Sequence, residues 1–359
     1  MKLLYPAFII CKMAYKWDEC YKQLNMKATT RWGIIGPGSI ARLFARDLSL
    51  IAAPQEIVAV LGHSEEGTDA FADEFNIPYA YTDPSRWLEK VRPDIVYIAT
   101  PHPDHFQHTL DCLEKKIPVL CEKPMTVNAD QCQQLINAAK ANKTFLMEGM
   151  WVRFLPSLQL VLNLIEEGRI GNVLAIKAST TFRAMPEDGS RYFDPEKGGG
   201  SLLDLGVYPV YLAQLLLGKP RSIKAIAKLS DEHVDENCSI LLQYRNGAYA
   251  MLESSLIAES DAPAEITGDK GSIKIFHPWF EKASGIELTE RGEGKIIYPC
   301  SWAGHGMQFE TEEVLHCIAE NKIESELHPL SASLDLITTL DEIRRQINVE
   351  YPAVEAVEG

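Results

Sequence analysis

A glycine-rich turn between an apolar strand and a helix is the feature that most constrains this chain. The apolar run 32–35 leads into Gly36-Pro37-Gly38-Ser39-Ile40-Ala41, and a helix-like stretch follows to about Ile51. In a G-x-G-x-x-A pattern the first glycine permits a tight turn, the second lets the backbone approach a pyrophosphate, and the small third residue lets helix and strand pack closely. The helix N-terminus supplies the positive end that phosphates require. The turn therefore predicts a dinucleotide site, whose expected members are Gly36, Gly38, Ser39 and Ile40.

Strands and helices alternate through the first part of the chain. Further strands are expected over 57–61, 95–99, 119–122 and 144–147, and helices over 68–75, 105–115 and 129–142. This alternation is typical of a parallel, doubly wound α/β sheet. We therefore predict a dinucleotide-binding Rossmann domain over residues 29–148.

Beyond residue 148 strand candidates follow one another with few helices between them. They cover 173–182, 222–229, 239–244, 248–257, 272–276 and 286–288, and two helices are expected over about 309–321 and 331–347. Successive strands indicate a large, open, mostly antiparallel sheet. The sequence thus predicts a second, α+β domain over 149–352 that binds substrate, followed by a tail, 353–359.

Residues 1–28 show no clear periodicity and contain three methionines, the last of them Met26. Two interpretations stay open: a disordered upstream extension, with translation starting at Met26, or a helix packed on the surface. The apolar stretch Leu3–Ile10 is interrupted by Pro6, and no small-x-small cleavage site follows it. We interpret it as non-targeting and expect a cytoplasmic protein.

Composition argues against several classes of protein. With 35 basic and 50 acidic residues the net charge is −15, which opposes binding to nucleic acid or to an anionic membrane. No run approaches the ~18 apolar residues that a bilayer-spanning helix needs. The eight cysteines are scattered without C-x-x-C or metal-ligand spacing, as is typical of reduced thiols.

The end of the second strand bears on the choice of dinucleotide. A carboxylate there would bind the ribose 2′-hydroxyl of NAD and repel the 2′-phosphate of NADP. Strand 57–61 is followed by Gly62-His63-Ser64 instead, and His63 and Ser64 can both donate to a phosphate. NADP is therefore favoured, with NAD as the alternative if His63 is simply a solvated loop histidine.

Four motifs together resemble the glucose-fructose oxidoreductase/inositol dehydrogenase/MocA (Gfo/Idh/MocA) family, and within it the dimeric dihydrodiol dehydrogenase and NADP-dependent D-xylose dehydrogenase branch. They are the glycine-rich turn, Cys121-Glu122-Lys123-Pro124-Met125, the segment 147–154 (MEGMWVRF) and the segment 198–208 (GGGSLLDLGVY). The resemblance covers roughly residues 31–352. It implies a homodimer that transfers hydride between NADP and a CH–OH group of a small sugar, polyol or trans-dihydrodiol.

Lys123 and Tyr208 are the expected catalytic pair. Lys123 follows a strand whose carboxyl end should face the cofactor crevice, where an ammonium can stabilise charge on a substrate oxygen. The resemblance implies that Tyr208 is the general acid/base. Its ordinary pKa of about 10 must fall for this task, and a nearby ammonium favours the phenolate. The alternatives are a surface lysine and a tyrosine buried in a helix.

Asp204 lies four residues before Tyr208, so the two would share one face of a helix. By resemblance Asp204 orients the substrate, although an N-cap or turn role competes. Trp151 and Phe154 are expected to form a wall of the substrate pocket, with Arg153 near the cofactor or substrate. All three could equally be core at a domain junction.

The remaining expected cofactor contacts are Thr100, Pro101, His102, His105, Glu122, Lys123, Trp151 and Arg153. His102, His105 and His108 recur every third residue, a spacing that invites a zinc interpretation. The threonine-proline turn and the following helix of the family explain His105 by packing, and hydride transfer to a nicotinamide needs no metal. We therefore expect no metal site.

Two other functions compete with dehydrogenation. A non-catalytic NADP-binding sensor would be expected to lack the lysine or the acid/base, whereas Lys123, Asp204 and Tyr208 are all present. The wider family also suggests an enzyme that recycles a tightly held cofactor, in sugar-to-sugar redox or glycoside cleavage. That alternative stays open, as does the identity of the substrate.

Overall fold

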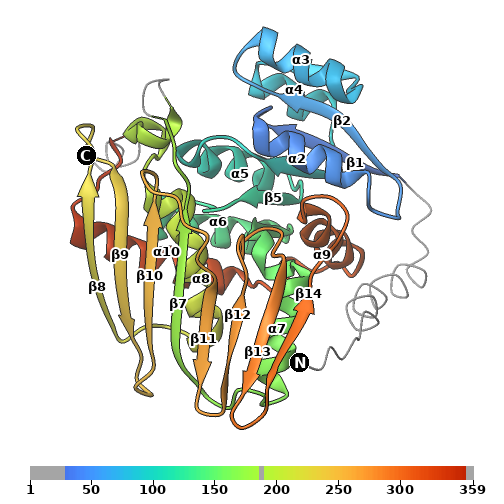
Figure 1. The fold of residues 1–359 in the computed structure, drawn as a ribbon. Coiled ribbons are helices and arrows are strands. Elements are labelled where there is room, and N and C mark those ends of the chain that lie inside the picture. Colours follow the sequence, from blue (N-terminus) through green and yellow to red (C-terminus); the bar gives the residue numbers. More distant parts are fainter. Residues whose placement is uncertain (1–28, 186–189, 353–359) are drawn as a thin grey trace. The chain divides into compact units, whose positions relative to one another are not determined.

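The structure, a computed structural model, describes residues 29–185 and 190–352, and these divide into two compact units. The first unit comprises residues 29–153 and 303–334, and the second comprises 154–302 and 335–352. Our expectations for the N-terminal extension 1–28 and the tail 353–359 lie outside the described residues. Figure 1 shows the elements of each unit.

The first unit is built on a six-stranded sheet in the order β3-β2-β1-β4-β5-β6, with every neighbouring pair parallel. Its strands are β1 (Thr30–Ile35), β2 (Gln55–Leu61), β3 (Tyr79–Tyr81), β4 (Ile95–Ile98), β5 (Val119–Glu122) and β6 (Leu146–Gly149). The predicted doubly wound sheet is confirmed. Strand order reverses between β1 and β4, and sheets of this kind bind ligands at the carboxyl ends of their strands beside that reversal.

The helices of this sheet are α2 (Ser39–Leu48), α3 (Glu65–Phe75), α4 (Pro84–Lys90), α5 (His105–Glu114) and α6 (Ala129–Asn142). In α2 the buried residues Ala41, Phe44, Ala45 and Leu48 follow helical spacing and form one apolar face. Phe44 stacks on Tyr97 of β4, with ring centroids 3.8 Å apart. The bounds of α6 coincide with the prediction. The helix begins at Ala129 because the side chain of Asn128 caps its first turn by accepting a hydrogen bond from the Gln131 N–H at 2.8 Å.

A segment distant in sequence completes the first unit. Residues 303–334 include α9 (Met307–Ala319) and the start of α10 (Leu330–Ile347). The buried carboxylate of Asp47 accepts hydrogen bonds at Oδ2 from the N–H groups of His305, Gly306 and Met307, at 2.8, 2.9 and 3.1 Å. We expected this segment in the second domain, whereas Asp47 holds it in the first unit. The domain boundaries as such stay a prediction.

The second unit contains an eight-stranded sheet in the order β14-β13-β12-β11-β7-β10-β9-β8. The strands are β7 (Val173–Thr181), β8 (Ser222–Leu229), β9 (Asp235–Gln243), β10 (Tyr249–Ser255), β11 (Ala264–Gly268), β12 (Gly271–Ile275), β13 (Gly285–Glu290) and β14 (Lys295–Pro299). Only β7 and β10 pair in parallel. The mostly antiparallel sheet is therefore confirmed, and β9 begins at Asp235, upstream of its expected start at residue 239.

Helices cover one face of this sheet. Figure 1 shows α7 (Pro156–Glu166), α8 (Val207–Leu217) and α10 behind the strands, and Gln346 of α10 hydrogen bonds to the backbone of β8 at Ile223 and Ala225. The stretch 195–217 is long and apolar enough to cross a membrane, but 72% of its apolar window is buried in the protein, as expected of a core helix.

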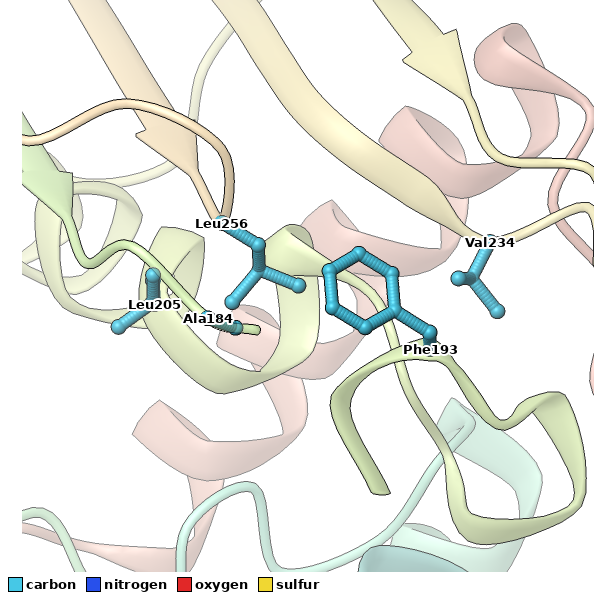
Figure 2. Close-up of a cluster of buried hydrophobic side chains, with 5 residues drawn as sticks. All are labelled: Ala184, Phe193, Leu205, Val234 and Leu256. Carbon is cyan, nitrogen blue, oxygen red and sulfur yellow. The ribbon is translucent and has the colours of Figure 1, made fainter. Parts of the chain in front are cut away.

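A small hydrophobic cluster closes one end of the second unit (Figure 2). Its buried members are Ala184, Phe193, Leu205, Val234 and Leu256. They come from the segment after β7, the turn 191–193, the helix before α8, the residue before β9 and the residue after β10. The cluster therefore holds the start of the helix that carries Asp204 and Tyr208 against the strand ends.

Candidate active site

The glycine-rich turn has the geometry that its sequence predicts. Gly36 has a φ of +92°, and a Cβ there would lie 2.6 Å from the carbonyl oxygen of Ala99, so only glycine fits. A Cβ on Gly38 would meet no described atom within 4 Å, and Gly38, the N-cap residue of α2, has no side chain with which to cap it. Gly38 and Ser39 are exposed and Ile40 is half-buried. The turn thus presents open backbone at a helix N-terminus, as a pyrophosphate requires.

The end of β2 carries no carboxylate. A Cβ at Gly62 would lie 2.2 Å from Thr68 Oγ1, so no side chain fits at that position. His63 is exposed, and Ser64 caps α3 by accepting a hydrogen bond from the Gly67 N–H at 3.3 Å. The hydroxyl of Ser64 thus already has a structural role, while the His63 imidazole faces solvent.

A buried histidine joins the turns after β4 and β5. His105 Nε2 lies 2.9 Å from the carbonyl oxygen of Thr100, and Nδ1 lies 2.9 Å from that of Pro124. Burial lowers the pKa of His105, while the two carbonyl contacts act in the opposite direction. Both ring nitrogens are engaged, so His105 positions the Thr100 turn and the Lys123-Pro124 turn and is not placed to ligate a metal.

Two buried polar atoms beside these turns have no hydrogen-bond partner within the described residues. They are Thr100 Oγ1 and Trp151 Nε1. Native proteins rarely leave such groups unsatisfied unless water or a ligand completes them. Both belong to residues expected at the cofactor, so the first unit fits a nicotinamide dinucleotide.

The other expected cofactor residues lie near the same strand ends. The ring of His102, which follows Pro101, is 5.8 Å from that of His105 between centroids. Trp151 and Arg153 belong to a 3-10 turn after β6, and Arg153 Nε donates to the carbonyl oxygen of Leu327 at 2.8 Å. Arg153 is buried, and this hydrogen bond joins the turn after β6 to the 303–334 segment. Phe154 is buried too and belongs to the second unit.

Asp204 and Tyr208 stand on consecutive helical segments of the second unit. Residues Leu202–Gly206 form a π-helical turn that runs directly into α8, which differs from the regular helix expected. Such turns are frequent at functional sites. Asp204 and Tyr208 are both buried, and the Tyr208 ring lies 5.4 Å from that of Phe280 between centroids.

Arg191 is a partner of the candidate residue Asp204 that the sequence did not reveal. Its Nη2 lies 3.1 Å from Asp204 Oδ1, and its guanidinium stacks over the Tyr192 ring at 4.4 Å. Burial opposes the charged guanidinium, but the interactions with Asp204 and Tyr192 together outweigh it and raise the pKa of Arg191. An ion pair between an irregular turn and a helix has no spacing signature, so only the structure could identify it.

Comparisons with known proteins agree with this arrangement. Residues 30–150 match the model of an oxidoreductase family with an NAD-binding Rossmann fold, and residues 158–274 match the GFO/IDH/MocA C-terminal domain. The trans-1,2-dihydrobenzene-1,2-diol dehydrogenase of Mus musculus is 33% identical over 332 residues, covering 90% of this chain and 98% of the relative. That of Xenopus laevis is 34% identical over 334 residues, covering 90% and 99%.

The chain belongs to the Gfo/Idh/MocA family. It is an NAD(P)-binding oxidoreductase, as its resemblance implied. Solved structures agree on the Gfo/Idh/MocA fold. An aldose-aldose oxidoreductase from Caulobacter crescentus superposes with a TM-score of 0.80 at 21% identity, covering 89% of this chain and 98% of that one. A 3-ketoreductase from Actinomadura kijaniata, solved with NADP, gives 0.77 at 24% identity and the same coverages.

Buried carboxyl groups lie beneath the nucleotide site of this Gfo/Idh/MocA protein. The Tyr97 hydroxyl donates to Glu122 Oε1 at 2.5 Å, and the Lys123 N–H donates to Glu122 Oε2 at 3.2 Å. Glu310 of α9 is fully buried, and neither carboxyl oxygen has a hydrogen-bond partner within the described residues. Burial, followed by the charges of Glu122 and Asp47, raises the pKa of Glu310 well above its ordinary value. Burial therefore favours the protonated form of Glu310.

Glu310→Gln should make stability less sensitive to pH. The folded protein keeps a proton on Glu310 that the unfolded chain releases above its ordinary pKa of about 4.3, so wild-type stability falls as pH rises from there toward the folded pKa. Glutamine cannot ionise. Urea unfolding at a series of pH values should show that the free energy of unfolding of the variant rises relative to that of the wild type as pH increases from about 4 to about 8.

Glu342→Gln provides the opposite control. Its ion pair with Arg345, with a further hydrogen bond from Gln346, lowers the pKa of Glu342 to about 2. The stability that Glu342 contributes is present above its ordinary pKa of about 4.3 and is lost as pH falls toward 2. The free energy of unfolding of this variant should therefore fall below that of the wild type as pH rises from about 2 to about 5, so the pH series is extended down to about 2. A pH-independent difference for Glu310→Gln would contradict the assignment.

Proposed function

We propose that this oxidoreductase transfers hydride between NADP and the CH–OH carbon of a small sugar, polyol or trans-dihydrodiol. The observation that carries the proposal is the placement of Lys123 directly after β5, in a turn that His105 fastens to Thr100. Ligands of doubly wound sheets gather at this edge. The names of the curated relatives, trans-1,2-dihydrobenzene-1,2-diol dehydrogenases, support a diol or a related polyhydroxylated substrate.

The residues of the first unit would hold the cofactor and the substrate oxygen. The backbone at Gly36, Gly38, Ser39 and Ile40 would cradle the pyrophosphate. The nicotinamide, when bound, supplies the hydride acceptor or donor. The ammonium of Lys123 would hold the substrate hydroxyl and stabilise the negative charge that grows on its oxygen as the proton leaves. Thr100 and Trp151 would complete their hydrogen bonds on cofactor or substrate.

The residues of the second unit would handle the proton. The Tyr208 oxygen would take the hydroxyl proton during oxidation and return it during reduction. Asp204, held by Arg191, would orient the substrate, and Phe154 would form an apolar wall for it.

Lys123→Met and Tyr208→Phe should each lower turnover by at least ~100-fold while leaving NADPH binding nearly unchanged, because both groups act on the reacting oxygen. The assay is NADP reduction over a panel of aldoses, inositols and trans-dihydrodiols, and NADPH binding is followed by fluorescence titration. Lys115→Met and Tyr211→Phe are matched controls that should keep near wild-type turnover. Full activity in either test variant would refute the role of that residue.

We also propose that NADP is preferred over NAD, because His63 stands where many NAD enzymes place a carboxylate. His63→Asp should lower kcat/KM for NADP by ~10-fold or more and raise it for NAD, because a carboxylate repels the 2′-phosphate. His63→Gln removes the imidazole without adding charge and should change NAD turnover little. Unchanged preference in His63→Asp would mean that the histidine is merely solvated.

The open face of the eight-stranded sheet supports the proposal of a homodimer. One outward row crosses the whole sheet in the order Lys224, Leu241, Met251, Lys177, Glu265, Lys274, Glu287 and Ile297. At the β8 side Ile226, Leu241 and Met251 are 74, 47 and 42% exposed. Lysine and glutamate flank this apolar patch, so a second copy related by a two-fold axis offers both apolar and charge complementarity.

Leu241→Asp should convert the protein to a monomer in light scattering, because it buries a charge in the proposed interface. Ile297→Asp is the matched control. Ile297 is 52% exposed at the other side of the sheet, beyond the ion pairs Lys274–Glu265 and Lys295–Glu287. It should leave the mass unchanged. A monomeric wild type would refute the dimer.

We further infer a cytoplasmic location. The six cysteines in the described part of the chain are all free, and five of them are buried. Free thiols are typical of proteins in reducing compartments.

A further inference from the structure

A buried carboxylate lies at the start of the helix that carries Asp204 and Tyr208. Asp235, the first residue of β9, is fully buried. Its Oδ2 accepts hydrogen bonds from Ser201 Oγ and from the Leu202 N–H, both at 2.7 Å. Ser201 Oγ also lies 2.8 Å from Ser254 Oγ of β10, and both serines are fully buried. A polar cluster of Ser201, Asp235 and Ser254 thus joins two strands to the helix start.

The cluster caps the helix from outside. The first N–H groups of a helix lack partners within it and form its positive end. Leu202 begins the π-helical turn, and the side chain of the preceding Ser201 caps no N–H group of that turn. Asp235 supplies the acceptor instead, from a strand more than thirty residues along the chain. The carboxylate therefore fixes where the helix starts.

Glycines bring the chain close to this carboxylate. Gly200 has a φ of +109°, and a Cβ there would lie 2.3 Å from Asp235 Oδ1. A Cβ on Gly199 would lie 2.8 Å from the Tyr192 carbonyl oxygen. The segment between Gly199 and the helix thus passes between Asp235 and the turn that carries Arg191. The helix start and the partner of Asp204 are fixed by the same packing.

The hydrophobic cluster of Figure 2 lies beside this polar cluster. Val234 precedes Asp235, Leu205 follows Asp204, and both belong to one buried cluster with Phe193 of the Arg191 turn. These apolar contacts can hold the segments together, so a charge is not needed for packing alone. Burying a carboxylate costs free energy that an apolar side chain of similar volume avoids.

Two opposing effects act on the Asp235 carboxyl at the helix start. Burial raises the pKa of Asp235 to about 7, while the hydrogen bonds from Ser201 and Leu202 act in the opposite direction and favour the charged form. The other titratable groups that interact with it are Cys238 on its own strand and Tyr351, which lies near Arg344. The hydrogen bonds from the helix start thus offset part of the burial penalty.

We propose that Asp235 is a positioning residue for the reaction. Through Ser201 and the Leu202 N–H it sets the start of the helix that places Asp204 and Tyr208, and it does so without touching substrate or cofactor. The inference rests on the role proposed for Tyr208. It predicts that loss of the Asp235 carboxyl lowers kcat far more than it weakens NADPH binding, because misplacement of a reacting group slows the chemical step.

The test compares Asp235→Ala with Asp235→Asn in the full-length protein, assayed with NADP and the best substrate of the panel. Asp235→Ala should lower kcat by ~10- to 100-fold with the NADPH dissociation constant unchanged. Asp235→Asn should restore most of kcat, because its amide oxygen can accept both hydrogen bonds. An equal loss in both variants, or no loss in Asp235→Ala, would overturn the proposal.

Two further variants separate positioning from stability. Ile240→Val, at a buried position of the same strand, should lower the Tm but leave kcat unchanged. Ser201→Ala keeps the carboxylate and removes one hydrogen bond, so it should lower kcat several-fold. If Asp235→Ala does not fold, wild-type kcat in Ser201→Ala overturns the proposal, and a loss supports it.

The failure of this inference is distinguishable from the failure of the proposed function. If Tyr208→Phe is inactive while Asp235→Ala and Ser201→Ala keep wild-type kcat, the proposed chemistry stands and the positioning role of Asp235 is wrong. If Tyr208→Phe keeps full activity, the chemistry assigned to that helix is wrong whatever Asp235 does.

Discussion

A buried imidazole between two carbonyl oxygens is the contact on which the nucleotide site depends. His105 lies at the start of α5 and reaches Thr100 on one side and Pro124 on the other. The turns that follow β4 and β5 are thereby held at a fixed separation, with Lys123 in the second of them. Loops at strand ends are otherwise the least constrained parts of a doubly wound sheet. Here one side chain fixes two neighbouring loops, and the first of them follows β4, beside the point where strand order reverses.

Buried carboxylates likewise hold together segments that are distant in the sequence. Asp47 holds the N–H groups before α9, and Asp235 holds the start of the helix leading into α8. Glu148 accepts from the Met125 N–H at 2.9 Å and contacts His328 Nε2 at 3.1 Å. A carboxylate that accepts N–H hydrogen bonds gives a directional contact that apolar packing lacks. Burial of these groups costs desolvation free energy, and their hydrogen bonds define the position of the backbone.

The predictable parts of the fold are those whose signal is local and repeated. The apolar strands of the first sheet and the capped helix α6 have such signals, and the sequence located them. The short strands β3, β11 and β14 and helices α4 and α7 escaped prediction, because short or edge elements bury few residues and show little periodicity. Helix α7 had a usable signal in Pro156 at its first position.

The sequence by itself determined the fold class, the glycine-rich turn and the candidates Lys123, Asp204 and Tyr208, because each belongs to a short motif whose residues are neighbours in the chain. Only the tertiary structure decided that residues 303–334 join the first unit and that Arg191 pairs with Asp204. It also decided that Glu310 is buried with no hydrogen-bond partner among the described residues and that Asp235 caps a helix. The physical reason is that burial and hydrogen bonding depend on which distant segments fold together. The residues next to a carboxylate in the sequence do not indicate which distant group it will contact.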